Sequence, residues 1–176
     1  IVATVVSIDP ERGNVVLDLG KGGTAVLPRN EQVPGETFTE GQTVQVYVVD
    51  VLATDRGPRV TISRTHPGLV KRMFELEVPE IYDGTVEVKA IAREAGARTK
   101  LAVWSKNPDV DPVGACIGAR GARVEKIVQE LNGEKIDVIR WSEDITEFIS
   151  AALSPAKVVK VELLPGETKS CRVTVP

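Results

Sequence analysis

The feature that most constrains the fold is a change in hydrophobic periodicity near residue 66. Before it, apolar and polar residues alternate in short runs, and glycine, proline, asparagine or aspartate separates one run from the next. This pattern is typical of short β-strands joined by turns. After it, apolar residues begin to recur three and four positions apart, which is the spacing of one helix face. The sequence therefore predicts an all-β part followed by a part that mixes helices and strands.

The all-β part, residues 1–65, contains five predicted strands with one longer connection after the third. They are the runs IVATVVSID, NVVLDL, TAVLP, TVQVYVVDVLAT and RVTISR. In so short a segment, closing the sheet into a barrel is the simplest way to remove exposed strand edges. We therefore expect a small five-stranded barrel of the OB type.

Residues 66–142 predict an α+β domain. A helix follows Pro67, and the runs TVEVKAIARE and TKLAVWS then form a β-hairpin. Asp111 before Pro112 is typical of a capped helix start, which opens the short helix PVGACI. A second helix follows Gly121, and the strand KIDVIRW closes the domain.

Residues 143–176 repeat the beginning of this order of elements. Ser142 is expected to cap a helix, and the runs VVKVELL and SCRVTV predict a hairpin around Pro165 and Gly166. We interpret this segment as an internal repeat whose second copy is incomplete. The sequence is accordingly expected to be a fragment, trimmed at both ends.

The most informative motif reads IGARGARVEKI, residues 117–127, in which Gly118 and Gly121 enclose two residues. Glycine allows backbone dihedrals that other residues avoid and lets a ligand approach closely. A helix that begins near Gly121 directs free N–H groups and a partial positive charge at the gap. The motif therefore predicts a phosphate-binding loop, and a plain glycine-rich turn between two helices is the alternative.

Nucleic-acid-binding residues are expected in and beside this loop. The net charge of −3 argues against binding by overall charge, but between Arg98 and Lys126 there are six basic residues and three acidic ones. Apolar side chains next to the glycines would form a groove on which unpaired bases lie. The candidate RNA-binding residues are Ile117, Gly118, Ala119, Arg120, Gly121, Arg123 and Val124, together with Arg98 and Lys100.

No catalytic residue, metal site or cofactor is predicted. Cys116 and Cys171 lie far apart and form no metal-binding spacing with the single histidine, His66. We expect two buried, reduced thiols. The acidic residues Glu75, Glu77 and Glu80 are interpreted as a solvent-exposed helix face and its end.

A helix, a glycine loop and a second helix after a β-hairpin form the core of the KH module, and the helix-first order here resembles its type II form. Three stretches are similar to the NusA family of transcription factors beyond that general pattern. They are SRTHPGLVKRMFELEVPEIYDGTVEVKAIAREAGARTKLAVWS, NPDVDPVGACIGARGARVEKIVQELNGEKIDVI and WSEDITEFISAALSPAKV. The resemblance covers all 176 residues.

The resemblance implies a multidomain chain: an S1-type OB domain at 1–65, a first type II KH domain at 66–142, and the start of a second KH domain at 143–176. It implies binding of single-stranded nascent RNA, with RNA polymerase and other Nus factors as partners of the full-length protein. The implied role is control of pausing, termination and antitermination by a cytoplasmic monomer that is not an enzyme and does not contact membranes. The family's N-terminal polymerase-binding domain is expected outside this sequence.

Two other functions stay open at this stage. One is an accessory region of an RNA-processing exonuclease, although there the KH domain usually precedes the S1 domain. The other is a protein-docking scaffold. The predicted second and third strands of the barrel lack the aromatic residues on which many S1-type domains stack bases. The barrel is therefore expected to contact RNA weakly through Arg12, Lys21 or Arg29, or to serve as a rigid arm.

Aspartate at both Gly118 and Gly121 should abolish RNA binding and leave the fold intact, because side chains and like charge would occupy the path of the RNA backbone. Fluorescence anisotropy with a short unstructured RNA measures the binding, and circular dichroism measures the fold. Unchanged binding by a folded double variant would contradict the role of the loop.

Overall fold

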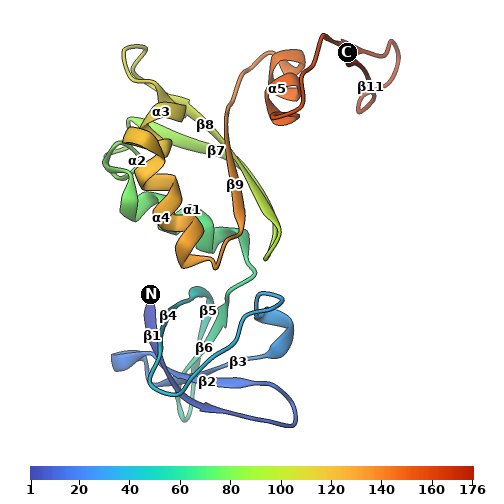
Figure 1. Ribbon diagram of the computed structural model, residues 1–176. Helices are drawn as coiled ribbons and strands as arrows, with labels where there is room; N and C mark the ends of the chain where they lie inside the picture. Colours follow the sequence, from blue (N-terminus) through green and yellow to red (C-terminus); the bar gives the residue numbers. More distant parts are fainter. The chain divides into compact units, whose positions relative to one another are not determined.

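The structure is a computed structural model that describes residues 1–176. The chain separates into two compact units (Figure 1). The first contains Ile1–Arg72 and Glu94–Gly96, and the second contains Met73–Arg93 and Ala97–Pro176. No helix combines the length and the apolar character that crossing a membrane requires.

The first unit consists of strands and short 3-10 turns. Its main sheet has the order β3-β2-β1-β4, and a separate antiparallel hairpin pairs β5 with β6. The bounds are β1 (Val2–Ile8), β2 (Val15–Asp18), β3 (Thr24–Leu27), β4 (Thr43–Gln45), β5 (Tyr47–Thr54) and β6 (Gly57–Ser63), with turns η1 (Gly20–Gly22) and η2 (Arg29–Glu31).

The run TVQVYVVDVLAT, predicted as one strand, is two strands in the structure. It breaks at Val46, so that β4 pairs with β1 and β5 pairs with β6. Val46 is buried, its N–H donates to the carbonyl of Ile1, and the amino group of Ile1 donates to its carbonyl. The strand breaks because the residues before Val46 pair with β1 in the main sheet, whereas the residues after it pair with β6 in a separate hairpin.

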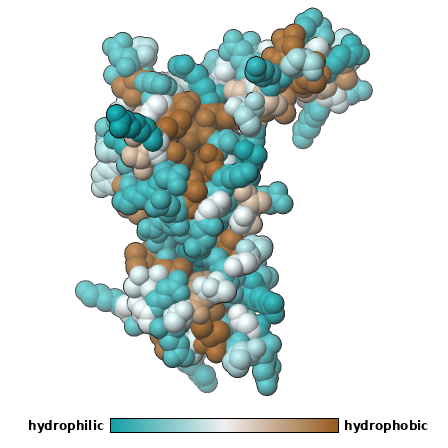
Figure 2. All heavy atoms as spheres, viewed as in Figure 1, coloured by the Kyte–Doolittle hydropathy of each residue, from teal (hydrophilic) through white to brown (hydrophobic).

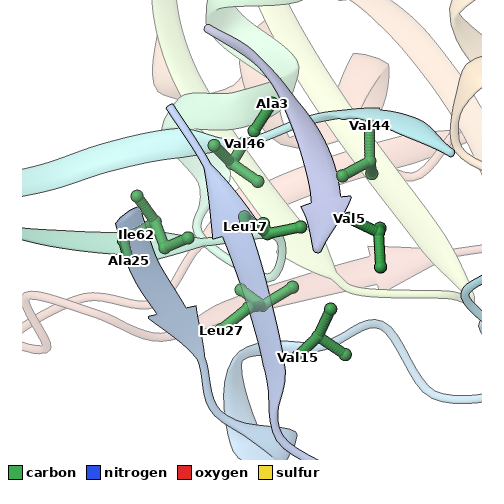
Figure 3. Packing of buried hydrophobic residues seen from close by; sticks show 9 residues of the cluster. All are labelled: Ala3, Val5, Val15, Leu17, Ala25, Leu27, Val44, Val46 and Ile62. Carbon is green, nitrogen blue, oxygen red and sulfur yellow. The ribbon is translucent and has the colours of Figure 1, made fainter. Parts of the chain in front are cut away.

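Alternation of buried residues along the strands builds the core of this unit, as the period-two pattern predicts. Figure 3 shows its nine side chains, which are Ala3, Val5, Val15, Leu17, Ala25, Leu27, Val44, Val46 and Ile62. Both aromatic rings of the unit are engaged within it. Phe38 packs against this cluster, and Tyr47 stacks on His66 with ring centroids 4.5 Å apart.

The second unit mixes helices and strands. Its sheet has the order β7-β8-β9, in which β8 and β9 are parallel, and an antiparallel hairpin pairs β10 with β11. Helix α1 (Pro67–Glu77) ends in this unit. The other elements are α2 (Pro79–Tyr82), β7 (Val86–Glu94), β8 (Arg98–Ser105), α3 (Pro112–Ile117), η3 (Ala119–Gly121), α4 (Ala122–Glu130), β9 (Lys135–Arg140), α5 (Ile145–Ala152), β10 (Lys160–Leu163) and β11 (Cys171–Thr174).

The connection from β8 to β9 places the glycine motif. Parallel neighbours need a crossover, and α3, η3 and α4 supply it here. Leu101 and Val103 on β8 are buried, as are Ile127 on α4 and Leu131 after it. The helical spacing of apolar residues thus buries one side of α4 and leaves the glycine turn at the beginning of that helix.

Two local predictions are wrong. Asp144, not Ser142, caps α5: its Oδ1 accepts from the N–H of Thr146 at 2.9 Å. Ser142 Oγ accepts instead from the N–H of Asp144, which precedes the helix. Hydrogen bonds from Thr146 hold the pKa of Asp144 below its ordinary value. Cys116 is buried as expected, but Cys171 is exposed, because β11 lies in an isolated two-stranded hairpin.

A buried ion pair joins the sheet to the turn before β9. The side chains of Arg93 on β7 and Glu134 are fully buried, and Arg93 Nη2 lies 3.0 Å from Glu134 Oε1. Arg93 Nε and the hydroxyl of Thr99 on β8 both donate to Glu134 Oε2, at 3.1 and 2.8 Å. The carboxylate thereby connects β7, β8 and the entry to β9.

Glu134→Gln should destabilise the protein by about 3–5 kcal/mol, because it removes the carboxylate from a buried ion pair with Arg93. Urea unfolding followed by circular dichroism measures the change. Glu162→Gln is the control, since Glu162 pairs with Lys160 at the surface and its loss should leave the midpoint unchanged. Equal midpoints for both variants would contradict the importance of the buried pair.

Candidate nucleic-acid interface

The turn between α3 and α4 is short and strongly bent. Asp111 caps α3 as predicted, with its Oδ1 accepting from the N–H of Val113 at 3.1 Å. The helix ends at Gly118, whose N–H donates to the carbonyl of Gly114 at 2.9 Å. One 3-10 turn then leads into α4, and no side chain caps the beginning of α4. The N–H groups of Gly121 and Ala122 already donate to the carbonyls of Gly118 and Ala119 within this turn, so hydrogen-bonding capacity for a ligand would lie with the N–H groups that follow them.

Gly118 is required by both its conformation and its surroundings. Its dihedrals are φ 78° and ψ 174°, a region that is almost restricted to glycine. A Cβ at this position would lie 2.7 Å from Cγ of Arg123 and 3.0 Å from its backbone nitrogen. The aspartate expected to leave the fold intact is therefore badly tolerated here, so that part of the expectation is corrected.

Gly121 has a different environment. It is left-handed, with φ 77° and ψ 12°, and the nearest atom to an added Cβ would be Val124 Cγ1 at 4.0 Å. A side chain at this position would thus project into open space beside the beginning of α4. Arg120 is also left-handed, with φ 55°, and its exposed side chain has no ion pair or hydrogen bond.

The two cations on α4 are paired with carboxylates. Arg123 Nη1 lies 3.0 Å from Glu80 Oε2, and Lys126 Nζ lies 2.7 Å from Glu77 Oε1. The hydrogen bond from Glu77 raises the pKa of Lys126. Reading Glu77 and Glu80 as a merely solvated face was therefore wrong. The sequence contained one signal for these ion pairs: Glu77 and Glu80 are three residues apart, as are Arg123 and Lys126.

Half-buried apolar side chains stand in the loop and on α4 and β9, which follow it, and together they are called the apolar strip here. Ile117 and Val124 are half-buried, as are Val128 on α4 and Ile136 and Val138 on β9. Figure 2 shows hydrophobic atoms gathered on the face where Figure 1 draws α3, α4 and β9. Strand β9 is the outer strand of its sheet, so one of its edges has no neighbouring strand.

The structure does not bring Arg98 and Lys100 to this loop. Both stand at the beginning of β8, beside the beginning of β9, where Asp137 Oδ2 lies 2.7 Å from Arg98 Nε and 4.0 Å from Lys100 Nζ. Lys100 Nζ also donates to the carbonyls of Ala152 and Ser154, at 2.5 and 2.6 Å. Lys100 therefore satisfies carbonyls at the end of α5, as cations at helix C-termini do.

Comparison with known proteins adds to this geometry. The profile of the NusA-like first KH domain matches residues 64–141. Residues 64–141 belong to the NusA-like first KH domain family. The residues whose geometry is described above, from α3 through the glycine turn to β9, thus lie in a KH domain.

The similarity extends beyond the KH domain. The chain is 56% identical over 162 residues to the transcription termination/antitermination protein NusA of Halalkalibacterium halodurans, covering 92% of this chain and 42% of that protein. It is 53% identical to NusA of Bacillus subtilis, with 92% and 43% covered, and 48% identical to NusA of Mycobacterium tuberculosis, with 100% and 52% covered. The chain thus spans about half or less of these relatives.

The buried cysteine of the KH domain gives a direct test of packing under the loop. Burial, and then the nearby Glu80 carboxylate, raises the pKa of Cys116 to about 12. Thiols react as thiolates, so this buried thiol, which stays protonated at ordinary pH, should be unreactive in the folded protein.

At pH 8, Ellman's reagent should modify one thiol rapidly in the folded protein, that of the exposed Cys171, and a second only after unfolding. A Cys171→Ser variant is the control and should show no rapid reaction. Two rapidly reacting thiols in the folded protein would contradict the burial of Cys116.

Proposed function

We propose that this chain is an RNA-binding region of a NusA-type transcription termination/antitermination factor, and that its KH domain grips the backbone of single-stranded RNA. The observation that carries the proposal is the glycine turn at the uncapped beginning of α4, next to an apolar strip. The relatives with similar sequences are named for termination and antitermination. This supports a transcription factor over an accessory region of an exonuclease.

The residues of the turn would have different roles in RNA binding. Gly118 and Gly121 let the RNA backbone approach the N–H groups of α4, which favour a phosphate. Arg120 would add charge, since it is exposed and unpaired. Ile117 and Val124 would support the bases, whose edges would reach the free edge of β9. Only unpaired bases can enter such a groove.

The domain division belongs to the same proposal: an S1-type OB barrel at 1–65, a first KH domain at 66–142 and the start of a second at 143–176. The packing of the β5–β6 hairpin onto the main sheet through Ile62 supports a barrel. The helix α5 followed by the β10–β11 hairpin repeats the helix-then-hairpin order and supports a second KH domain.

Partners beyond RNA are assigned to the full-length protein. RNA polymerase and other Nus factors would bind it during pausing, termination and antitermination, in the cytoplasm where a bacterial transcript is made. Residues 1–176 would act as a monomer and without catalysis. Because Phe38 and Tyr47 are engaged inside the first unit, that unit would contact RNA without stacking bases.

Gly121→Asp should weaken binding to a short unstructured RNA at least tenfold, because it places a carboxylate where the proposed phosphate lies. Gly133→Asp is the matched control: Gly133 has φ 93° with open space around it, but it follows the far end of α4. Both variants carry the same new charge at a position with positive φ.

Fluorescence anisotropy at two salt concentrations measures the affinities, and thermal unfolding checks both variants. Salt-sensitive binding that Gly121→Asp loses and Gly133→Asp keeps would support the proposed site. Equal loss in both folded variants would place the RNA elsewhere. Absence of binding by the unchanged chain would favour a protein-docking role.

A further inference from the structure

The side chain of Arg123 joins three helices. Its Nη1 donates to the carbonyl of Ala115 on α3 at 2.7 Å and to Glu80 Oε2 on α2 at 3.0 Å, while its own backbone lies in α4. The Ala115 carbonyl belongs to the last turn of α3, where carbonyls lack helical partners. Arg123, in the first turn of α4, therefore donates a hydrogen bond to a carbonyl at the end of α3.

The stem of the same side chain shapes the loop. The place that a Cβ of Gly118 would occupy is filled by Cγ, Cβ and the backbone nitrogen of Arg123, at 2.7 to 3.1 Å. The polypeptide at Gly118 thus lies directly against this arginine. The conformation of the first glycine and the position of Arg123 depend on each other.

The charge of Arg123 is already matched. The Glu80 carboxylate lies within hydrogen-bond distance, and the two side chains are 32% and 33% exposed. A phosphate would have to compete with that carboxylate for the guanidinium. Arg120, between the glycines, has no such competitor in the structure.

We propose that Arg123 is a positioning residue that holds the glycine loop in its binding conformation, and that Arg120 is the arginine that contacts phosphate. This inference rests on the proposed RNA-binding function. It departs from the expectation that both arginines contact RNA directly.

The first measurement is the salt dependence of RNA binding by Arg120→Ala and Arg123→Ala. A lost phosphate contact reduces the slope of log K against log salt by about 0.7 for a single strand. Arg120→Ala should show this reduction and bind about fivefold more weakly, equivalent to about 1 kcal/mol for a charge-assisted contact. Arg123→Ala should bind at least as weakly with an unchanged slope.

The second measurement uses no RNA, so it tests the positioning role even if the proposed function fails. Amide hydrogen exchange at Gly118 and Gly121 should accelerate in Arg123→Ala and stay unchanged in Arg120→Ala. The thermal midpoint of each variant separates this local effect from general unfolding. Arg123→Lys, which keeps the charge without the planar fork, should restore neither exchange protection nor affinity.

Three results would overturn the assignment. One is a reduced salt slope in Arg123→Ala with unchanged exchange at Gly118, which would make Arg123 a phosphate ligand. Another is full recovery of affinity in Arg123→Lys, which would mean that charge alone matters. The third is an unchanged salt slope in Arg120→Ala, which would remove the phosphate contact assigned to Arg120.

Discussion

The close approach of Gly118 to Arg123 is the constraint on which the crossover between β8 and β9 depends. Helix α3 ends and α4 begins within one 3-10 turn, and this turn has room for the arginine stem only because residue 118 has no side chain. If the two helices separated, Ile127 of α4 would no longer be buried. No side chain caps the beginning of α4 next to this close contact.

Charge in this region is mostly neutralised inside the protein. Glu80 and Glu77 pair with the two cations of α4, and Asp137 pairs with Arg98. A chain with a net charge of −3 thus presents few unmatched cations around the loop. Recognition of RNA here would depend on backbone N–H groups, one exposed arginine and an apolar strip. Such a surface would favour unpaired bases over a duplex, whose bases could not reach it.

The interior of the second unit supports this surface in another way. The pair formed by Arg93 and Glu134, with the hydroxyl of Thr99, ties β7, β8 and the entry to β9 together. Fully hydrogen-bonded buried charges of this kind tolerate little displacement, since losing one partner leaves the other uncompensated. The position of β9 relative to β8, and hence the edge of the proposed groove, is specified by this contact as well as by apolar packing.

The sequence by itself determined the location of the loop and the order of most elements, but it did not predict α2. Alternating residues predicted the strands of the first unit, helical spacing predicted α4, and Asp111 before Pro112 predicted the start of α3, because these signals are local. Only the tertiary structure decided which charges are free. Arg120 and Arg123 look equivalent in the motif, but Glu80, 43 residues away in sequence, neutralises one of them. It also decided the break at Val46 and the engagement of Lys100 with α5, because both depend on partners that are distant along the chain.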